Sequence, residues 1–412
     1  MPSSSNRRVG VSRRRRGVVV VGGGIVGLAT AYRLLEADPD RPVTVLERES
    51  RVGTHQSSRN SGVLHAGLYY PPGSRKARWA VAGKRALEAF CDQHGVPVVR
   101  SGKVVVAVDP SELEGLRRLA ERARTNGVEV VELDADQVAE HEPHVSAIAG
   151  LWSPGTAVTD FGRVCEALAA VVQARGGRVL TGVVMHHLDD RGEVVRIGTS
   201  EDDLEADAVV VCAGAQADRI ARASGVDVPE RIVPFRGSWL RLRPDRAHLV
   251  RGNIYPVPVG GGLPFLGVHL TRRVDGEVWI GPNAVLAGAR DAARPWQVDP
   301  RDLAATLGFA GTWRLGGRHL DVAAGEVWRD AVLRATLRRV QAYVPRIGID
   351  DVRRGPFGVR AQLVSADGAL VDDFEVRGTG RIVHLLNAPS PAATASLSIG
   401  AALADEVATR TG

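Results

Sequence analysis

Hydrophobic positions near the N-terminus change from one repeat pattern to another. Four consecutive valines occupy residues 18–21, and such a β-branched run predicts a strand covered on both faces. Glycines follow, and apolar positions then recur at helical spacing through residues 25–36. A second apolar run at residues 43–46 ends at Glu47. The order predicts a strand, a glycine loop, a helix and a second strand, which together form a βαβ unit.

The same two periodicities continue along the chain and predict a mixture of helices and strands. Residues 57–70, rich in Gly, Ser and Asn, predict a long loop, and alternating segments between residues 234 and 282 predict a mixed or antiparallel sheet in a second lobe. Further helices are expected at 77–94, 112–125, 161–175, 216–223, 329–343 and 392–408, and further strands at 103–108, 178–181, 208–212 and 381–386.

The glycine loop matches the pattern G-x-G-x-x-G. Gly22 permits the tight turn after the strand, Gly24 lets the backbone approach a pyrophosphate, and Gly27 allows the helix to pack closely on the strand. Glu47, 23 residues after Gly24, is placed to accept hydrogen bonds from ribose hydroxyls, and its charge would repel the 2′-phosphate of NADP. A structural glycine turn with a surface glutamate is the alternative, but it requires several features to coincide by chance.

Later segments favour FAD over NAD. A NAD dehydrogenase would continue with a third βα unit, whereas residues 55–62 begin a long loop suited to wrapping a larger cofactor. Residues 387–394 would bring another helix N-terminus, with its positive dipole end, towards a reduced flavin. The residues expected to bind FAD are Gly22, Gly24, Ile25, Val26, Gly27, Glu47, Arg48, Ser57, Asn60, Ser61, Gly62, Val183, Ala213, Gly214, Pro389, Ser390, Pro391, Ala392, Ala393 and Thr394.

At these residues the chain resembles the D-amino-acid-oxidase-like family of FAD proteins, and within it the L-2-hydroxyglutarate dehydrogenase/oxidase group. Two departures stand out. Arg59 occupies a position where that group is expected to have His, and residues 311–355 resemble the group poorly. The matching stretches are residues 20–28, 60–70, 234–237, 264–272, 281–284, 358–362 and 387–394.

The resemblance implies an α/β fold in two parts. One is a Rossmann-like FAD-binding domain with a doubly wound, mostly parallel sheet, and the other is an inserted α+β substrate domain on a mixed or antiparallel sheet. We expect residues 1–16 to form a disordered basic tail. The FAD-binding domain is expected to take residues 17–85, 150–225 and 355–412, and the substrate domain residues 86–149 and 226–354.

The resemblance also implies the reaction, which is oxidation of a carbon that bears a hydroxyl or amine next to a carboxylate. We expect oxidation of a 2-hydroxy acid to the 2-oxo acid by hydride transfer to flavin N5, with L-2-hydroxyglutarate as the leading substrate. An amine or amino-acid oxidase of the same fold and a biosynthetic flavoenzyme for a bulkier acid are the alternatives within enzymes. A non-catalytic flavin-binding or tRNA-interacting protein is the alternative from another class.

Such a reaction needs a cation to hold the substrate carboxylate. We assign this role to Arg360, because a guanidinium binds a carboxylate bidentately and the resemblance places a carboxylate-binding Arg in this stretch. A dicarboxylate needs a second cation, for which Arg236 and Arg272 are candidates, although a structural or surface ion pair is an equal explanation for each. Asn387 is a further candidate for contact with the substrate.

The reaction also needs a base for the hydroxyl proton. Histidine is suited to this role because its pKa lies near neutrality. Two histidines are equal candidates: His65 lies in a glycine-flanked stretch, and His269 lies on an expected strand of the second lobe. His384 is expected to be a structural residue of a strand. A lone His is more often structural. Tyr70 and Tyr255 are expected either to line the pocket or to belong to the core.

Charge argues against a nucleic-acid partner. The formal net charge is +6, but the first 16 residues carry six arginines and no acid. Without these six, 47 basic residues face 47 acidic residues, so no basic groove is expected on the folded body. The tail itself is expected to be a solvated leader, with contact to an anionic membrane surface or to RNA as the alternative.

Other sequence features limit location and cofactors. No apolar run is long enough to span a membrane, and glycines interrupt residues 18–31, so we expect no signal peptide and a cytoplasmic protein. Cys91, Cys165 and Cys212 lie far apart, which predicts neither a disulfide framework nor a structural metal. The expected partners are a small carboxylic acid and an electron acceptor, which is oxygen, a quinone or another flavoprotein.

Overall fold

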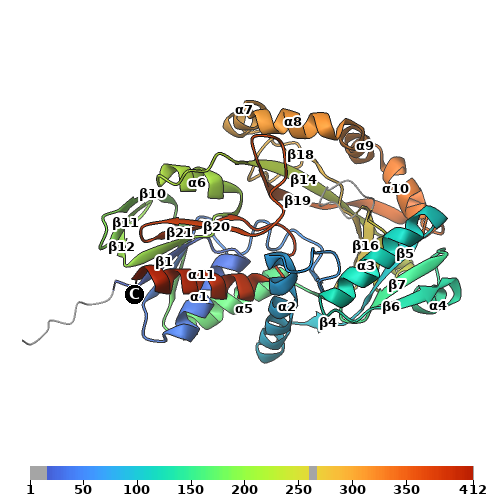
Figure 1. Ribbon diagram of the computed structural model, residues 1–412, viewed down its shortest axis with the longest axis horizontal. Helices are drawn as coiled ribbons and strands as arrows, with labels where there is room; N and C mark the ends of the chain where they lie inside the picture. The colour runs from blue at the N-terminus through green and yellow to red at the C-terminus, as the bar shows by residue number, and fades with distance from the viewer. Residues whose placement is uncertain (1–15, 259–266, 412) are drawn as a thin grey trace, which may run out of the picture.

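The computed structural model describes residues 16–258 and 267–411. Two large sheets organise this part of the chain, one mostly parallel and one mixed (Figure 1). The predicted fold class is therefore confirmed. The expected tail lies outside the described residues except for Arg16, which pairs with Glu205 at 3.1 Å.

The parallel sheet grows from the valine run. Each valine of β1 is buried, because a neighbouring strand lies on either side and another layer covers each face. β1 pairs in parallel with β2 and β13, so the carboxyl ends of these three strands lie at the same edge of the sheet. The strand order is β20 (Glu375–Thr379), β21 (Ile382–Asn387), β13 (Ala208–Val211), β1 (Val18–Val21), β2 (Val43–Glu47) and β9 (Arg178–Thr181), with only β20 antiparallel among them.

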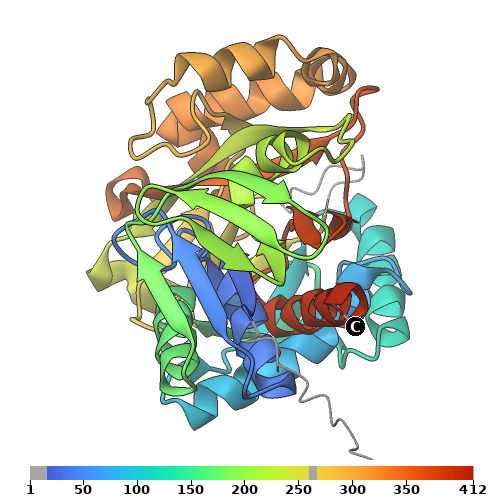
Figure 2. The ribbon, with the colours of Figure 1, turned by 90° about the vertical axis from the view of Figure 1, so that its left-hand side faces the viewer.

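Different layers cover the two faces of this sheet (Figure 2). Val18 and Val20 point towards the helices, whereas Val19 and Val21 point towards a small antiparallel sheet. Two of these helices, one containing Ala29 and the other Gly400, pack very closely. A Cβ on Gly400 would lie only 2.7 Å from the backbone of Ala29. The helices are α1 (Ile25–Ala37), α5 (Phe161–Ala174) and α11 (Ser396–Thr411), and the small sheet contains β10 (Met185–Asp190), β11 (Val195–Thr199) and β12 (Leu204–Ala206).

The second sheet has nine strands within the described residues. β5 and β15 pair in parallel, and the other pairs are antiparallel. The expected domain boundaries at residues 150 and 355 fall inside β7 (Ala149–Ser153) and β19 (Val352–Val364), two strands of this sheet. The strand order is β18 (Val285–Leu286), β14 (Arg231–Leu242), β17 (Val278–Gly281), β16 (His269–Arg272), β15 (Asn253–Pro256), β5 (Lys103–Ala107), β7 (Ala149–Ser153) and β6 (Val131–Asp134), with β19 (Val352–Val364) beside β14.

Helices cover this second sheet at both ends. In Figure 1 three consecutive helices run along the top, over β14, β18 and β19. These are α7 (Pro300–Leu307), α8 (Ala310–Arg318) and α9 (Leu320–Ala331). The remaining elements are α2 (Arg75–Gln93), α3 (Leu113–Thr125), α4 (Ala135–His141), α6 (Ala217–Ala223), α10 (Leu333–Gln341), and the small sheet of β3 (Val63–Leu64), β8 (Ala157–Thr159) and β4 (Val98–Val99).

Among the expected elements, two helices near the C-terminus differ from the observed ones. The helix expected at residues 329–343 is two helices, because the chain breaks at Val332, whose N–H still bonds to the carbonyl of Trp328. The last helix begins at Ser396 rather than at residue 392, because the preceding residues form hydrogen-bonded turns that start at Pro389 and Pro391. α7 and α8 were not expected from the sequence pattern.

Candidate active site

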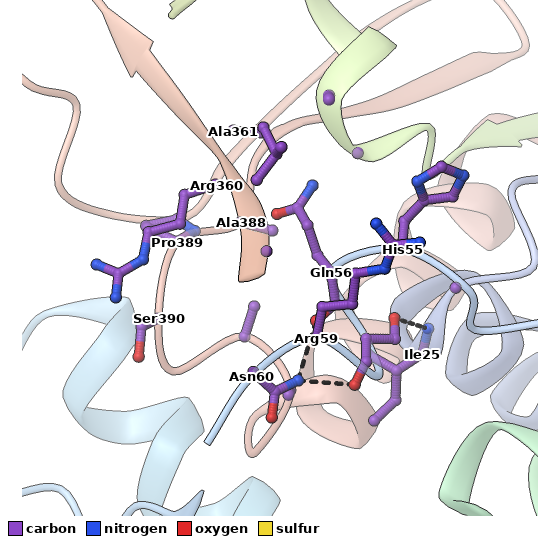
Figure 3. Close-up of a pocket in the computed structure, with 18 of the residues that line it drawn as sticks. Ile25, His55, Gln56, Arg59, Asn60, Arg360, Ala361, Ala388, Pro389 and Ser390 are labelled. Atoms are coloured by element: carbon purple, nitrogen blue, oxygen red, sulfur yellow. Dashed lines mark hydrogen bonds between the residues drawn. The ribbon is translucent and has the colours of Figure 1, made fainter. Parts of the chain in front are cut away.

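A cavity of about 620 Å³ lies between the carboxyl ends of the parallel strands and the second sheet. Nineteen of the twenty expected cofactor residues line it, together with His65, His269, Arg360 and Tyr255. Figure 3 shows Arg360 and Ser390 on one side of this space, with residues 55–60 on the other. The tertiary structure thus gathers segments that are more than 300 residues apart in sequence.

The glycine loop forms the narrow end of the cavity. Gly22 has a positive φ of 113°, and a Cβ there would lie 2.3 Å from the carbonyl oxygen of Cys212. A Cβ on Gly27 would lie 1.9 Å from the carbonyl oxygen of Gly22, so this position requires glycine for helix packing. A Cβ on Gly24 would meet only the Ser57 hydroxyl, at 3.3 Å. The space in front of Gly24 is therefore open to a ligand.

The loop after β2 is organised by short polar contacts. The N–H of Ile25, at the start of α1, donates to the hydroxyl of Ser57 at 3.0 Å (Figure 3). Asn60 donates to the carbonyl of Ser57 at 2.7 Å and accepts from the N–H of Gly62 at 2.9 Å. Gly62, with a φ of 78°, is the one expected cofactor residue that does not line the cavity, because it shapes the turn behind it.

Glu47 lies at the end of β2, as expected, and is 8% exposed. Its carboxylate accepts from the N–H of Gly23 at 2.7 Å and from the N–H of Glu49 at 2.9 Å. A carboxylate has about four acceptor sites, so it keeps capacity for a sugar hydroxyl. Next to it, Arg48 pairs with Asp291 at 2.7 Å, and this hydrogen bond raises the pKa of Arg48.

Arg360 projects from β19 into the other end of the cavity. It is half-buried, and burial lowers the pKa of its guanidinium, while the charge of Glu326 opposes this. Glu326 comes from α9 and also lines the cavity, where its carboxylate accepts from the N–H of Ala284 at 2.8 Å. Sequence reasoning missed Glu326, because residues 311–355 carry no matching motif.

His269 is held in one orientation. Its Nδ1 lies 3.1 Å from the carbonyl oxygen of Gly267, and its ring stacks on Tyr255 with centroids 4.0 Å apart. Because a carbonyl only accepts, Nδ1 carries the hydrogen and Nε2 keeps its lone pair in the neutral ring. Burial lowers the pKa of His269 to about 3, and the charges of Lys103 and Arg360 contribute to this. The ring is therefore neutral near neutrality and can accept a proton at Nε2.

His65 faces the same cavity from the loop after β3. Its backbone N–H donates to the hydroxyl of Thr394 at 3.2 Å. Its Nδ1 has no hydrogen-bond partner within residues 16–258 and 267–411. Burial lowers the pKa of His65 well below its usual value, and the charges of Lys103 and His269 add to the effect. The structure thus brings both candidate bases to one site.

Several side chains at this end were missed by sequence reasoning. Trp239 contacts His269 edge to face at 5.6 Å, and Gln362 and Arg59 also line the cavity. Arg59 is the position at which the sequence departs from its resemblance, and its guanidinium donates to a backbone carbonyl. Lys103 is the first residue of the apolar strand β5 and lies against the ring of Tyr255. A lysine at the start of such a run was the one available sequence signal.

The two arginines expected to hold a distal carboxylate do not line the cavity. Arg236 forms an ion pair with Asp330. Arg272 donates to the backbone carbonyls of Ala247 and Val250, at 3.3 and 3.0 Å. Both guanidinium groups are used in structural contacts, so neither is retained here as a substrate anchor.

Three other candidates also lie outside the cavity. Tyr70 is buried against α2. Asn387 donates to the backbone carbonyls of Val371 and Asp373, at 2.7 and 2.9 Å, and so fixes a turn behind the site. His384 is fully buried on β21, as its strand pattern indicated, and burial lowers its pKa to about 4.

Within the described part of the chain, no group of three or more His, Cys, Asp or Glu side chains is arranged to hold a metal ion. No helix in that part is both long enough and apolar enough to cross a membrane.

Comparison with known proteins gives matches over nearly the whole chain. A family model described as FAD dependent oxidoreductase matches residues 17–406. A mitochondrial L-2-hydroxyglutarate dehydrogenase from Caenorhabditis elegans is 41% identical, with 95% of this chain and 93% of that protein covered. An L-2-hydroxyglutarate dehydrogenase from Escherichia coli K12 is 41% identical with the same shares covered. An FAD-bound L-α-glycerophosphate oxidase structure from Mycoplasma pneumoniae has a TM-score of 0.76 at 22% identity, covering 94% of each chain.

Proposed function

Because this chain belongs to the FAD-dependent oxidoreductase family, we propose that it oxidises a 2-hydroxy acid to the 2-oxo acid, with L-2-hydroxyglutarate as the leading substrate. Relatives that carry that substrate in their name are 41% identical over 95% of the chain. The structural observation that supports this most directly is the cavity in which Arg360 lies close to a neutral, oriented His269.

The cavity fits the cofactor that the family requires. The open space over Gly24 and the N-terminus of α1 would hold the pyrophosphate, because free N–H groups and the helix dipole favour an anion there. Glu47 would accept from the adenosine ribose, and residues 388–394 would contact the flavin side. When bound, FAD supplies the acceptor for the hydride that leaves the substrate carbon.

The chain's own residues then bind and orient the acid. Arg360 would grip the carboxylate next to the reacting carbon bidentately, which fixes the hydroxyl on that carbon. His269 is the base that this arrangement favours, since its Nε2 keeps a free lone pair and its ring lies in the same cavity as Arg360. The enclosing aromatic side chains, Tyr255 and Trp239, exclude water from the reacting groups.

Anaerobic mixing of the flavin-loaded protein with single acids tests this proposal. The panel contains L- and D-2-hydroxyglutarate, smaller L-2-hydroxy acids and the matching L-2-amino acids. Bleaching of the flavin absorbance by L-2-hydroxyglutarate, and by none of the amino acids, is the expected result. Bleaching by an amino acid alone would contradict it and favour the amine-oxidase alternative. D-2-hydroxyglutarate is the matched control, because it has the same two carboxylates but the opposite configuration at the carbon that loses the hydride.

The electron acceptor and the cytoplasmic location stay predictions. Oxygen, a quinone and another flavoprotein remain alternative acceptors. Reoxidation of the substrate-reduced protein by oxygen or by a soluble quinone, followed at the flavin band, separates the first two. Fractionation of cells into soluble and membrane material tests the location.

A further inference from the structure

Lys103 is a buried cation with no counter-charge among the described residues. It begins β5, an interior strand of the second sheet between β15 and β7, and it is 0% exposed. Its Nζ has no hydrogen-bond or ion-pair partner in the described part of the chain. Instead it lies 4.2 Å from the ring centroid of Tyr255 and 5.0 Å from that of Tyr69. Burying an ammonium without a carboxylate is costly, so such a position calls for an explanation.

The position of Lys103 relative to the cavity offers that explanation. Tyr255, which contacts the ammonium, lines the cavity and stacks on His269. The charge of Lys103 acts on both His65 and His269, while the charge of Arg360 acts on His269 and Tyr255. Two cations on different strands, β5 and β19, therefore flank the same aromatic and imidazole pair.

Building on the proposed function, we propose that Lys103 makes this cavity select dicarboxylates. Arg360 holds the carboxylate beside the reacting carbon, and the ammonium of Lys103 attracts the second carboxylate at the opposite end of the substrate. Lys103 does not line the cavity itself, so it acts through the ring of Tyr255 and through the field that it creates. It is a specificity-determining residue and not a catalytic one.

The surroundings of Lys103 support this role. The groups that face it are Tyr69 and Tyr255, with His65 and His269 beyond them, and none of the four carries a negative charge near neutrality. Burial lowers the pKa of Lys103 to about 7, and no acidic group offsets it. An arriving carboxylate would stabilise the charged form of the lysine, because charges interact strongly where water is excluded. Arg236 and Arg272, the other candidates, are occupied elsewhere.

The test compares two substrates that differ only in the distal charge. They are L-2-hydroxyglutarate and its distal amide, which has the same shape but no second charge. In the Lys103→Met variant, kcat/KM for the dicarboxylate is expected to fall about tenfold or more, and that for the amide to change by less than about twofold. Equal losses for both substrates would overturn the proposal, since they would indicate a structural role only.

Lys76 provides the matched control. It is also buried, at 4% exposure, but it pairs with Asp372 at 2.7 Å and does not line the cavity. The Lys76→Met variant is expected to keep the wild-type ratio of kcat/KM for the two substrates. A similar change of this ratio in both variants would count against a special role for Lys103.

The pH dependence gives a readout that a structural role would not move. In the wild type, kcat/KM for the dicarboxylate relative to the amide should fall as the pH rises above about 7, because the free enzyme loses the lysine proton there. In Lys103→Met the ratio should be independent of pH. A wild-type ratio that stays constant from about pH 6 to pH 9 would overturn the proposal.

Binding measurements separate this proposal from the proposed function. Calorimetric titration of the flavin-loaded protein with 2-oxoglutarate and with its distal amide reports charge selection without turnover. Preferential binding of the dicarboxylate that disappears in Lys103→Met would support the role of Lys103 even if no 2-hydroxy acid bleached the flavin. Equal binding of the two compounds by the wild type would refute it even if L-2-hydroxyglutarate were oxidised.

Discussion

At the residue scale, burial sets the charge state of the groups at the reactive end of the cavity. His65 and His269 are kept neutral by desolvation, and the nearby cations strengthen the effect. Arg360 keeps its charge because its ordinary pKa lies so far above neutrality. The site therefore presents a cation for a carboxylate beside bases that are free to accept a proton, which is the combination that oxidation of a hydroxy acid requires.

Removal of the carboxylate anchor should affect turnover without loss of the cofactor. In Arg360→Met we expect kcat/KM for the acid to fall about 10²- to 10³-fold, because a charge-assisted bidentate contact is lost. Arg360→Lys keeps a positive charge but lacks the planar guanidinium. Its kcat/KM should therefore lie between that of Arg360→Met and that of the wild type. Steady-state kinetics together with flavin content test this. Retained kcat/KM in Arg360→Met would show that another group binds the acid.

The choice between the two histidines can be tested by matched variants. If His269 is the base, His269→Gln should lower kcat about 10²- to 10⁴-fold, and His65→Gln should lower it much less. Glutamine keeps a polar group of similar length in each case. Single-turnover flavin reduction is the measurement, since it reports the chemical step directly. The reverse order of the two effects would move the role to His65.

Lys103 also makes a prediction about stability. Its pKa in the folded protein is about 7, below the value of about 10.4 for a free lysine. The folded state therefore binds fewer protons than the unfolded state between about pH 7 and pH 10, and wild-type stability should rise with pH across that window. Lys103→Met removes the penalty, so its melting temperature should exceed that of the wild type most clearly below about pH 7. Thermal melts over this pH range provide the check, and a less stable variant would contradict the reasoning.

At the scale of elements, the β1–loop–α1 unit combines two uses of glycine. Gly27 allows the helix to lie against the loop, where a Cβ would clash with the carbonyl oxygen of Gly22. Gly24 instead keeps the front of the loop open to a ligand. One glycine serves packing and the other serves the cofactor, although both belong to the same motif.

Alanine substitutions should separate these two uses. Gly27→Ala is expected to lower the melting temperature of the cofactor-free protein, because the added Cβ must displace backbone atoms. Gly24→Ala should leave that temperature nearly unchanged and weaken FAD binding, because its Cβ enters the ligand space. Thermal melts without FAD and fluorescence titration with FAD distinguish the two. Equal losses of stability would contradict the division of roles.

At the scale of the whole molecule, the site exists only where the two sheets meet. The parallel sheet contributes the glycine loop, Glu47 and residues 388–394, and the second sheet contributes His269, Tyr255 and Arg360. α9, from the segment that matched no motif, adds Glu326 beside Arg360. The chemistry of this enzyme is therefore a property of the assembled chain, and the cavity residues all lie between Val21 and Thr394.

Removal of residues 1–15 should consequently leave the reaction intact. kcat and KM for the acid are expected to match those of the full chain, because no cavity residue is lost. Binding to anionic liposomes should fall if the arginines of this segment contact membranes, since the rest of the chain is nearly neutral. Kinetics and liposome sedimentation of the two proteins, side by side, test both statements. A large fall in kcat after truncation would contradict the first.

Local pattern determined the elements and the cofactor motif. The valine run, the glycine spacing and the acidic residue at the end of β2 each depend on neighbours a few residues away, so periodicity and steric rules were enough to predict them. The same is true of the expected helices and strands, and of the loop that Ser57 and Asn60 organise. Only the tertiary structure decided which of the candidate charged side chains line the cavity. Arg236 and Arg272 were candidates for a distal carboxylate in sequence, but an ion pair with Asp330 occupies the first and two backbone carbonyls occupy the second. Lys103 and Glu326 reach the site through contacts between distant segments, which no local pattern encodes.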